Sequence, residues 1–189
     1  MNARLQELCD RADILACIQR YARGMDRRDR ELVRSAYHDD AVDEHIGFVG
    51  PVDDFIDWAF AYHETQTRYQ HYLLNHTADI AGDEAHAETY YLFVGTDRAP
   101  ANHLTINGGR YIDRLERRDD RWAIAARVCV VEWHTEGTTL ITDETMGFLA
   151  DILTVAHDHS DISYERPLKI ARQRPTDPAT GAFTSSDTA

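Results

Sequence analysis

The stretch YLLNHTADIAGDEAHAETYYLFVG, residues 72–95, decides the fold. Its first half alternates between two sets of side chains, which is the period of a β-strand and not of a helix. Gly82, Asp83 and Glu84 interrupt the alternation with residues that are typical of a turn. Residues 85–95 are rich in aromatic and β-branched side chains and predict a second long strand. Two long strands joined by so short a turn predict an antiparallel hairpin.

The residues that follow continue the strand pattern. Segments 103–118 and 122–136 predict two more long strands, joined by a tight connection at residues 119–121. The pair Gly108-Gly109 falls inside the third strand and predicts a bulge or a sharp bend of the sheet. Short links between long strands predict an antiparallel meander rather than βαβ units.

The residues before the hairpin have the period of helices. Residues 4–25 carry an apolar stripe at spacings of three and four, made of Leu5, Leu8, Ala12, Leu15, Ile18 and Ala22. Asp29 is predicted to cap a second short helix, residues 41–47 a short strand, and residues 50–64 a third helix that begins with Gly-Pro. Helices followed by strands predict an α+β fold, in which one curved, mainly antiparallel sheet packs on N-terminal helices. Residues 142–158 predict a further helix or a covering loop.

Composition limits the class of protein and its partners. The chain has 189 residues and a formal net charge of −13, so it should repel phosphate backbones, and we expect no nucleic-acid partner. No apolar run approaches the roughly 18 residues of a membrane helix, and we expect no membrane contact. Three cysteines without a CxxC pair favour a reducing compartment and a cytoplasmic location. We expect one domain over residues 1–172 and a flexible tail over residues 173–189.

His76 is predicted to point to the core side of the sheet. Alternation puts it on one strand face with Tyr72, Leu74, Ala78 and Ile80. A buried imidazole must be hydrogen-bonded, because an unpaired buried polar group costs on the order of 1–3 kcal/mol. One interpretation is a core histidine that the backbone satisfies. The other is a general base whose tautomer is set by a carboxylate.

Asp26 is the candidate carboxylate. It lies four residues after Ala22 and therefore continues the apolar stripe of the first helix. The alternative is an ordinary acid in the loop that ends the helix. Tyr21, five residues earlier, is predicted to line the same pocket if the helix ends near Gly24.

Arg127 is the third polar residue on an apolar strand face. Its face-mates are Ala123, Ala125, Cys129, Val131 and Trp133. Buried arginine is rare without a paired anion. One interpretation is a structural ion pair with an acid such as Asp113. The other is stabilisation of an anion or of a leaving group.

The remaining histidines are predicted to be peripheral. His38, His45 and His63 are interpreted as surface or rim residues. His157 and His159 stand two positions apart with no evident third ligand, so we expect no metal site.

Five segments together resemble a known group of proteins: RYARGMDRRDRE (20–31), AYHDDAV (36–42), GPVDDFIDWA (50–59), NHTADI (75–80) and GGRYIDRLERRDDRWAIAARV (108–128). Over about residues 5–135 the chain resembles the SnoaL-like branch of the nuclear transport factor 2-like superfamily. The resemblance implies a cystatin-like α+β cone with a deep pocket. It also implies an apolar outer sheet face that a homodimer or homotrimer covers.

The resemblance also suggests a site. Dehydratase and dehydrochlorinase members of this branch use a His/Asp pair, and the positions that resemble it here are Asp26 and His76. Tyr21 and Arg127 also resemble family positions. The superfamily further includes polyketide cyclases, ketosteroid isomerases and small subunits of ring-hydroxylating dioxygenases.

The leading hypothesis is therefore a lyase of dehydratase type, or an isomerase, that needs no cofactor. It would act on a small hydrophobic, cyclic molecule, with His76 as base, Asp26 as its partner, and Tyr21 and Arg127 binding the developing charge. The alternative is a non-catalytic dioxygenase small subunit or a protein that binds hydrophobic ligands. The residues predicted to line the substrate pocket are Tyr37, Phe55, Trp58, Leu74, Tyr91, Asn107 and Tyr111.

Overall fold

The computed structural model of the protein describes residues 2–139 and 155–169. The helical elements in these ranges are α1 (Ala3–Arg27), α2 (Arg30–Arg34), α3 (Val52–Glu64) and the short 3₁₀ helix η1 (Ile162–Tyr164). The predicted tail, 173–189, and most of the segment 142–158 lie outside the described residues. No helix in the two described ranges is both long enough and apolar enough to cross a membrane.

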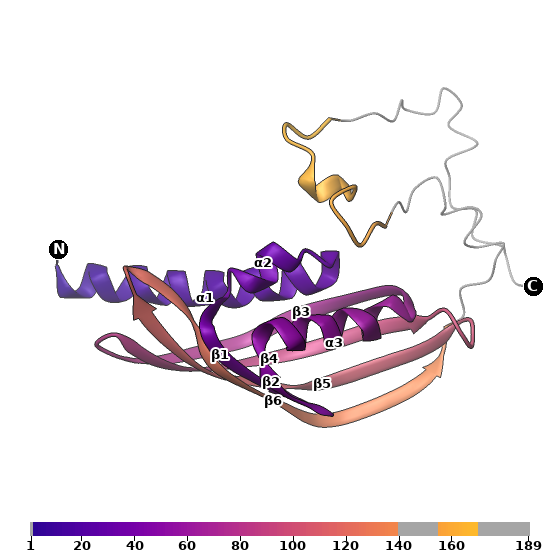
Figure 1. Ribbon diagram of the computed structural model, residues 1–189, viewed down its shortest axis with the longest axis horizontal. Helices are drawn as coiled ribbons and strands as arrows, with labels where there is room; N and C mark the ends of the chain where they lie inside the picture. Colours follow the sequence, from indigo (N-terminus) through magenta and orange to yellow (C-terminus); the bar gives the residue numbers. More distant parts are fainter. Residues whose placement is uncertain (1, 140–154, 170–189) are drawn as a thin grey trace, which may run out of the picture.

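One open sheet faces these helices. Its strands are β1 (Tyr37–His45), β2 (Phe48–Pro51), β3 (Gln66–Ala81), β4 (Glu84–Asp97), β5 (His103–Arg118) and β6 (Arg121–Thr138). The order across the sheet is β2-β1-β6-β5-β4-β3. Strands β3 to β6 form the predicted antiparallel meander, whereas β1 runs parallel to β6, so the sheet is mixed. Figure 1 shows that the sheet is curved and that α1, α2 and α3 all lie on one face. The predicted α+β cone is confirmed.

The end of α1 is fixed by a tight junction with α2. Arg28 adopts the left-handed conformation with φ of 45°, and the N–H of Asp29 donates to the Gly24 carbonyl at 2.9 Å. The Asp29 carboxylate then accepts from the N–H of Leu32 at 3.0 Å, which is the predicted cap of α2. A Cβ atom at Gly24 would lie only 2.6 Å from Cγ2 of Val33, so this close packing needs glycine.

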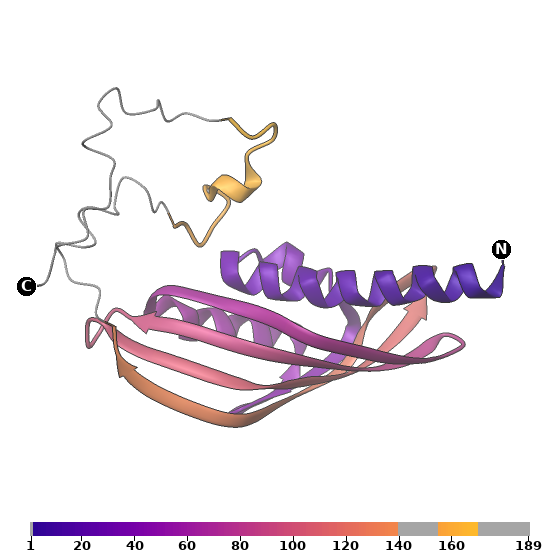
Figure 2. The ribbon, with the colours of Figure 1, turned by 180° about the vertical axis from the view of Figure 1, so that it is seen from behind.

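Helix α1 lies along β3 and runs in the opposite direction (Figure 2). Near the start of α1, Arg11 donates to the carbonyl of Ala78 at 2.6 Å, close to the end of β3. At the other end of α1, Asp26 reaches His71, in the first half of β3. Buried side chains of α1 fill the space above the sheet, namely Ile14, Cys17, Ile18, Tyr21 and Met25. This core holds the end of α1 against the first half of β3.

A bulge in β3 decides which of its side chains face the helices. Leu73 pairs with Tyr91 of β4, but His76 pairs with Thr89, so β3 carries one residue more than β4 over this interval. The extra residue moves the inward positions from odd numbers before the bulge to even numbers after it. Leu74, which alternation predicts to face the pocket, is consequently 58% exposed.

A second irregularity bends the sheet under the helices. The pairing of β5 with β6 shifts between Gly108 and Gly109, as predicted from the double glycine. A Cβ atom at Gly109 would lie 1.9 Å from the carbonyl oxygen of Val130, so only glycine fits this close approach of the two strands. The bend helps to curl the sheet around the space that the helices cover.

Candidate active site

A cavity of about 380 Å³ lies on the face of the sheet that the helices cover. Its volume is within the range of small-molecule sites. The aromatic part of the lining consists of Tyr21, Phe55, Trp58, Tyr62, Tyr91, Phe93 and Tyr111. The other polar side chains of the lining are His45, His63, His71, Asn107 and His134. A mostly aromatic wall with a few convergent polar groups suits a small hydrophobic ligand.

A larger hollow of about 900 Å³ lies near α2 but is much more open to solvent. Four of the charged groups along it pair with each other. Arg34 contacts Asp39 at 2.8 Å, and Arg30 contacts Asp53 at 3.4 Å. Such solvated ion pairs contribute little free energy. The aromatic cavity is therefore the candidate site.

His71, which lines the cavity, forms the first polar pair with Asp26. Oδ1 of Asp26 lies 2.7 Å from Nδ1 of His71, and both oxygens of the carboxylate accept from the backbone N–H of His71, at 3.1 and 3.2 Å. The side chains are 15% and 8% exposed, respectively. A carboxylate beside Nδ1 puts the ring proton on Nδ1 and leaves the lone pair on Nε2. The ring therefore lies at the cavity wall in the tautomer that a base requires.

The structure does not bring Asp26 and His76 together, so the predicted pairing of these two residues is wrong. Nδ1 of His76 instead lies 2.8 Å from Oγ1 of Thr89, and no hydrogen bond to another described residue reaches its buried Nε2. Partial burial lowers the pKa of His76. His76 does face the helices, but it lies beyond the bulge, near Arg11 in the first half of α1. The end of α1 therefore cannot reach it.

Strict alternation through residues 72–80 puts His71 on the outward face of β3, so the sequence does not predict its role. The bulge breaks that alternation, so His71 and Tyr69 face inwards although both have odd numbers. The neighbouring strand β4 indicates which residues at the start of β3 face inwards. Its odd-numbered residues from Ala85 to Phe93 are buried without interruption, and Phe93 is the partner of His71.

Tyr21 lines the cavity, as expected, whereas Arg127 does not reach it. Nε and Nη2 of Arg127 donate to the two oxygens of Asp113 at 2.6 and 2.8 Å, and both side chains are fully buried. The guanidinium group also lies 4.0 Å from the ring centre of Tyr21 and 4.3 Å from that of Tyr111. Arg127 is therefore the structural ion pair that the sequence left as an alternative, and it supports two rings of the cavity.

A second polar pair, His45 and Asp43, was not predicted. Nδ1 of His45 contacts the buried carboxylate of Asp43, and Nε2 lies 3.4 Å from the hydroxyl of Tyr21. Burial alone would lower the pKa of His45, but the charge of Asp43 and its hydrogen bond raise it to about 9. The sequence placed His45 at the surface or rim, but the ring lies in the cavity wall, stacked on Phe55 with 4.6 Å between the ring centres.

His63 is also part of the wall rather than of the surface. It stacks on Tyr69 with 4.3 Å between the ring centres, and its Nδ1 lies 3.0 Å from Oε1 of Gln66. Burial, together with the nearby His71, lowers the pKa of His63 to about 3. His63 is therefore neutral at ordinary pH and acts as a flat, uncharged part of the wall.

Most of the residues predicted for the substrate pocket do line the cavity, namely Phe55, Trp58, Tyr91, Asn107 and Tyr111. Leu74 does not, because the bulge turns it outwards. Tyr37 does not either. It is buried beneath the wall, where its hydroxyl donates to Asp43 at 2.6 Å.

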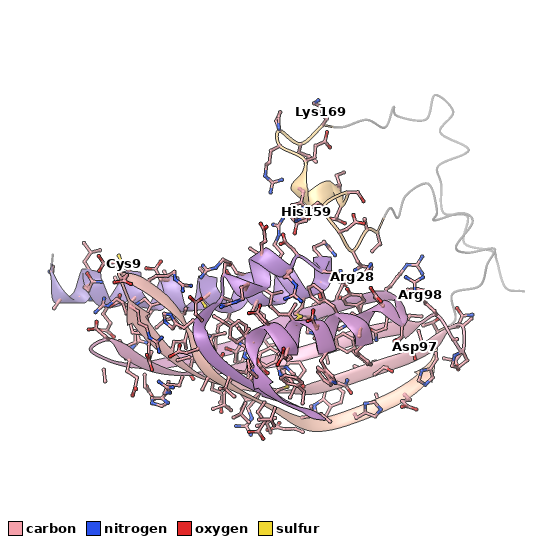
Figure 3. The ribbon with its side chains drawn as sticks, in the orientation of Figure 1. Cys9, Arg28, Asp97, Arg98, His159 and Lys169 are labelled. Atoms are coloured by element: carbon pink, nitrogen blue, oxygen red, sulfur yellow. The ribbon has the colours of Figure 1, made fainter. Side chains whose placement is uncertain are left out.

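Residues 155–169 pack against the end of α1, next to the first pair. Nδ1 of His157 lies 2.7 Å from the carbonyl oxygen of Asp26, and the ring stacks on Tyr69 with 4.1 Å between the centres. His159 and Tyr164 approach Oδ2 of Asp29 at 2.9 and 2.7 Å. Figure 3 shows His159 on this segment above the end of α1 that carries Arg28. These contacts restrain the backbone that presents Asp26.

Comparison with protein families bears directly on this architecture. Residues 6–128 match the model of the SnoaL-like domain. This chain belongs to the SnoaL-like domain family. The SnoaL-like domain begins in α1 and ends within β6, so it includes Asp26, His71, Asp43 and His45. Comparison with curated proteins returned no match.

Several solved structures share the fold of this SnoaL-like domain. The type 3 hexachlorocyclohexane dehydrochlorinase LinA from Novosphingobium barchaimii LL02 is 20% identical, with a TM-score of 0.66 over 71% of this chain and 94% of that one. A putative scytalone dehydratase from Novosphingobium aromaticivorans is 16% identical, with a TM-score of 0.63 over 70% and 91%. A putative aromatic ring hydroxylase from the same species is 21% identical, with a TM-score of 0.61 over 70% and 95%. At these identities the likeness establishes the fold alone.

Proposed function

We propose that this SnoaL-like domain is a lyase of dehydratase type, or an isomerase, that acts on a small hydrophobic, cyclic molecule without a cofactor. One observation carries the proposal: His71, in the wall of an aromatic cavity, is hydrogen-bonded to the carboxylate of Asp26. Proton transfer from carbon needs a base held beside the substrate, and this pair supplies one.

His71 replaces His76 as the proposed base. Its Nε2 accepts a proton from a carbon next to a carbonyl or leaving group. Asp26 then stabilises the imidazolium that forms, and its two bonds to His71 keep the ring in one orientation. The aromatic wall excludes water, which strengthens these electrostatic interactions.

Tyr21 is the proposed partner for the developing negative charge. Tyr21 lines the cavity, and burial raises the pKa of its hydroxyl far above 10, so the hydroxyl remains a neutral donor. Arg127 has a different role from the one expected. It touches the rings of Tyr21 and Tyr111 from behind and holds them in place.

A non-catalytic small subunit of a ring-hydroxylating dioxygenase is the second candidate. The similarity in fold to a putative aromatic ring hydroxylase favours it. In that case the polar pairs are structural, and the chain should co-purify in fixed stoichiometry with a large iron-containing subunit. Assembly of this chain into a homodimer or homotrimer is a prediction of its own, checked by the mass of the purified protein in solution.

Deuterium exchange tests the catalytic proposal without knowledge of the natural substrate. The purified protein in D₂O is given cyclic ketones without and with a β-hydroxyl group. NMR follows loss of the α-proton signal and, for the β-hydroxy ketones, appearance of the vinyl signal of the enone. We expect exchange in both sets and elimination in the second. His71→Gln should slow exchange by about 10²- to 10⁴-fold. Absence of exchange in every ketone, or exchange that does not need His71, contradicts the proposal.

A further inference from the structure

Asp43 is a fully buried carboxylate whose charge needs an explanation. Its side chain is 0% exposed, and burial of an unpaired carboxylate is costly. Tyr37 donates to Oδ2 at 2.6 Å, and His45 contacts Oδ1 through Nδ1. The buried Arg127 is engaged by both oxygens of Asp113. His45 is therefore the cation that balances Asp43.

The imidazole of His45 connects the buried carboxylate of Asp43 to the cavity. With Nδ1 committed to Asp43, the second ring nitrogen, Nε2, lies 3.4 Å from the hydroxyl oxygen of Tyr21. If Nε2–H donates to that oxygen, the hydroxyl proton of Tyr21 is free to donate in turn. Both groups line the cavity, and stacking on Phe55 fixes the plane of the imidazole. The result is a chain of hydrogen bonds in which Asp43 accepts from His45, His45 donates to Tyr21, and the hydroxyl of Tyr21 is free to donate to a ligand.

We propose that His45, held by Asp43, and Tyr21 together form an oxyanion-binding site in the cavity. This site takes the oxygen of a carbonyl or phenol-type ligand. The inference deepens the proposed function and rests on it for the reaction: the ligand is a ring compound whose oxygen becomes negatively charged when a neighbouring C–H proton is removed. Preorganised donors aimed at a developing oxyanion are a main source of catalysis.

The positions of His71 and His45 in the sheet suit their two proposed roles, as base and as part of the oxyanion site. His45 is on β1 and His71 on β3, and the sheet order places β6, β5 and β4 between these strands. In the proton-transfer step, the C–H electron pair becomes the new C=C bond and the carbonyl π pair moves to oxygen. The proton goes to Nε2 of His71. The oxygen then accepts a hydrogen bond from the hydroxyl of Tyr21, whose own oxygen accepts from Nε2–H of His45, and no further reactant is needed.

The groups that face His45 support a positive charge over a wide pH range. They are Asp43 from β1, Tyr21 from α1, Tyr111 from β5 and Cys129 from β6, with the uncharged Phe55 from α3. The cation Arg127 contacts Tyr37 and is paired with Asp113. Burial works against the charge, but Asp43 outweighs it and raises the pKa of His45 to about 9. The ring is therefore a donor at both nitrogens at neutral pH.

Binding of 4-nitrophenol tests this site directly, because the phenol and the phenolate have different absorption spectra. We expect the wild-type protein to bind it as the phenolate at a pH at which most of the free probe is the neutral phenol. His45→Gln should lower the affinity by at least about tenfold and shift the bound form towards the phenol. Tyr21→Phe, which removes one hydroxyl, should give a smaller loss.

The controls separate this inference from the proposed function. His76→Gln changes an imidazole outside the cavity and should bind the phenolate like the wild type. If the wild type binds no phenolate, or if a folded His45→Gln or Tyr21→Phe variant binds it equally well, the oxyanion site is overturned. Exchange that depends on His71 would stand in that case. Conversely, phenolate binding without exchange would retain the oxyanion site and overturn the proposed base.

Discussion

Asp26 holds His71 by both its backbone and its ring. The carboxylate accepts from the backbone N–H at 3.1 Å and from Nδ1 at 2.7 Å, so one side chain at the end of α1 fixes both the strand and the imidazole. The tautomer of His71 follows from this relationship, and the proposed chemistry follows from the tautomer.

Asp26→Asn should keep this geometry and remove the charge. The amide oxygen can still accept from His71, but it cannot stabilise an imidazolium. We expect deuterium exchange to fall by about 10²- to 10⁴-fold while the circular dichroism spectrum stays unchanged. Asp13→Asn, an exposed acid on the same helix, is the matched control and should keep the wild-type rate. Equal rates for the two variants would show that Asp26 has no part in proton transfer.

The pair His45–Asp43 should make stability depend on pH above neutrality. The folded pKa of His45, about 9, is above its ordinary value of 6.5, so the stabilisation is complete below pH 6.5 and is lost as the pH rises towards 9. Urea unfolding at pH 6 and above pH 9 measures the change. Relative to His45→Gln, the wild type should lose free energy of unfolding across this window. A difference between the two proteins that does not change with pH contradicts the assigned charge.

Arg127→Met should destabilise the fold strongly, because it leaves Asp113 buried without its partner. The expected loss is about 3–5 kcal/mol of unfolding free energy, measured with urea. Arg110→Met is the control on the neighbouring strand. Its ion pairs with Glu88 and Glu132 are partly exposed, so the expected loss is within about 1 kcal/mol. Similar losses in the two variants would contradict the structural role of Arg127.

Gly24→Ala should disturb both stability and the site. The added Cβ would lie 2.7 Å from the backbone nitrogen of Val33, which cannot move aside easily, and we expect a cost of about 1–3 kcal/mol. The strain falls two residues before Asp26, so exchange should slow as well. Gly137→Ala meets no atom within 4 Å and serves as the control. A Gly24→Ala protein as stable as Gly137→Ala would show that the junction of α1 and α2 is looser than described.

The fold was predictable from the sequence because each element has a clear local signal. The helical period of α1, the cap at Asp29 and the turns between β3, β4, β5 and β6 all depend on residues close together in the chain. Of the predicted stripe, Ile18 and Ala22 are buried, whereas Leu5 and Leu8 are 50% and 59% exposed. The parallel pairing of β1 with β6 was not predicted. This pairing joins segments far apart in sequence, and no short turn connects the two strands and indicates that they pair.

The candidate site was only half predictable. Asp26 was found because helical periodicity holds to the end of α1, but its partner depends on one extra residue in β3. A prediction from alternation assumes that every residue of a strand is paired. It therefore fails at a bulge where no glycine or proline indicates the extra residue. His45 was missed for a related reason: its importance comes from Asp43 two positions earlier, on the same face of a short strand, and this spacing resembles an ordinary solvated pair.

The most direct test of the account compares His71→Gln with His76→Gln in the deuterium exchange of a cyclic ketone. Both variants replace one imidazole on the inward face of β3, on either side of the bulge. We expect His71→Gln to lose about 10²- to 10⁴-fold in rate and His76→Gln to exchange like the wild type. Loss of exchange in His76→Gln, with His71→Gln still active, would contradict it.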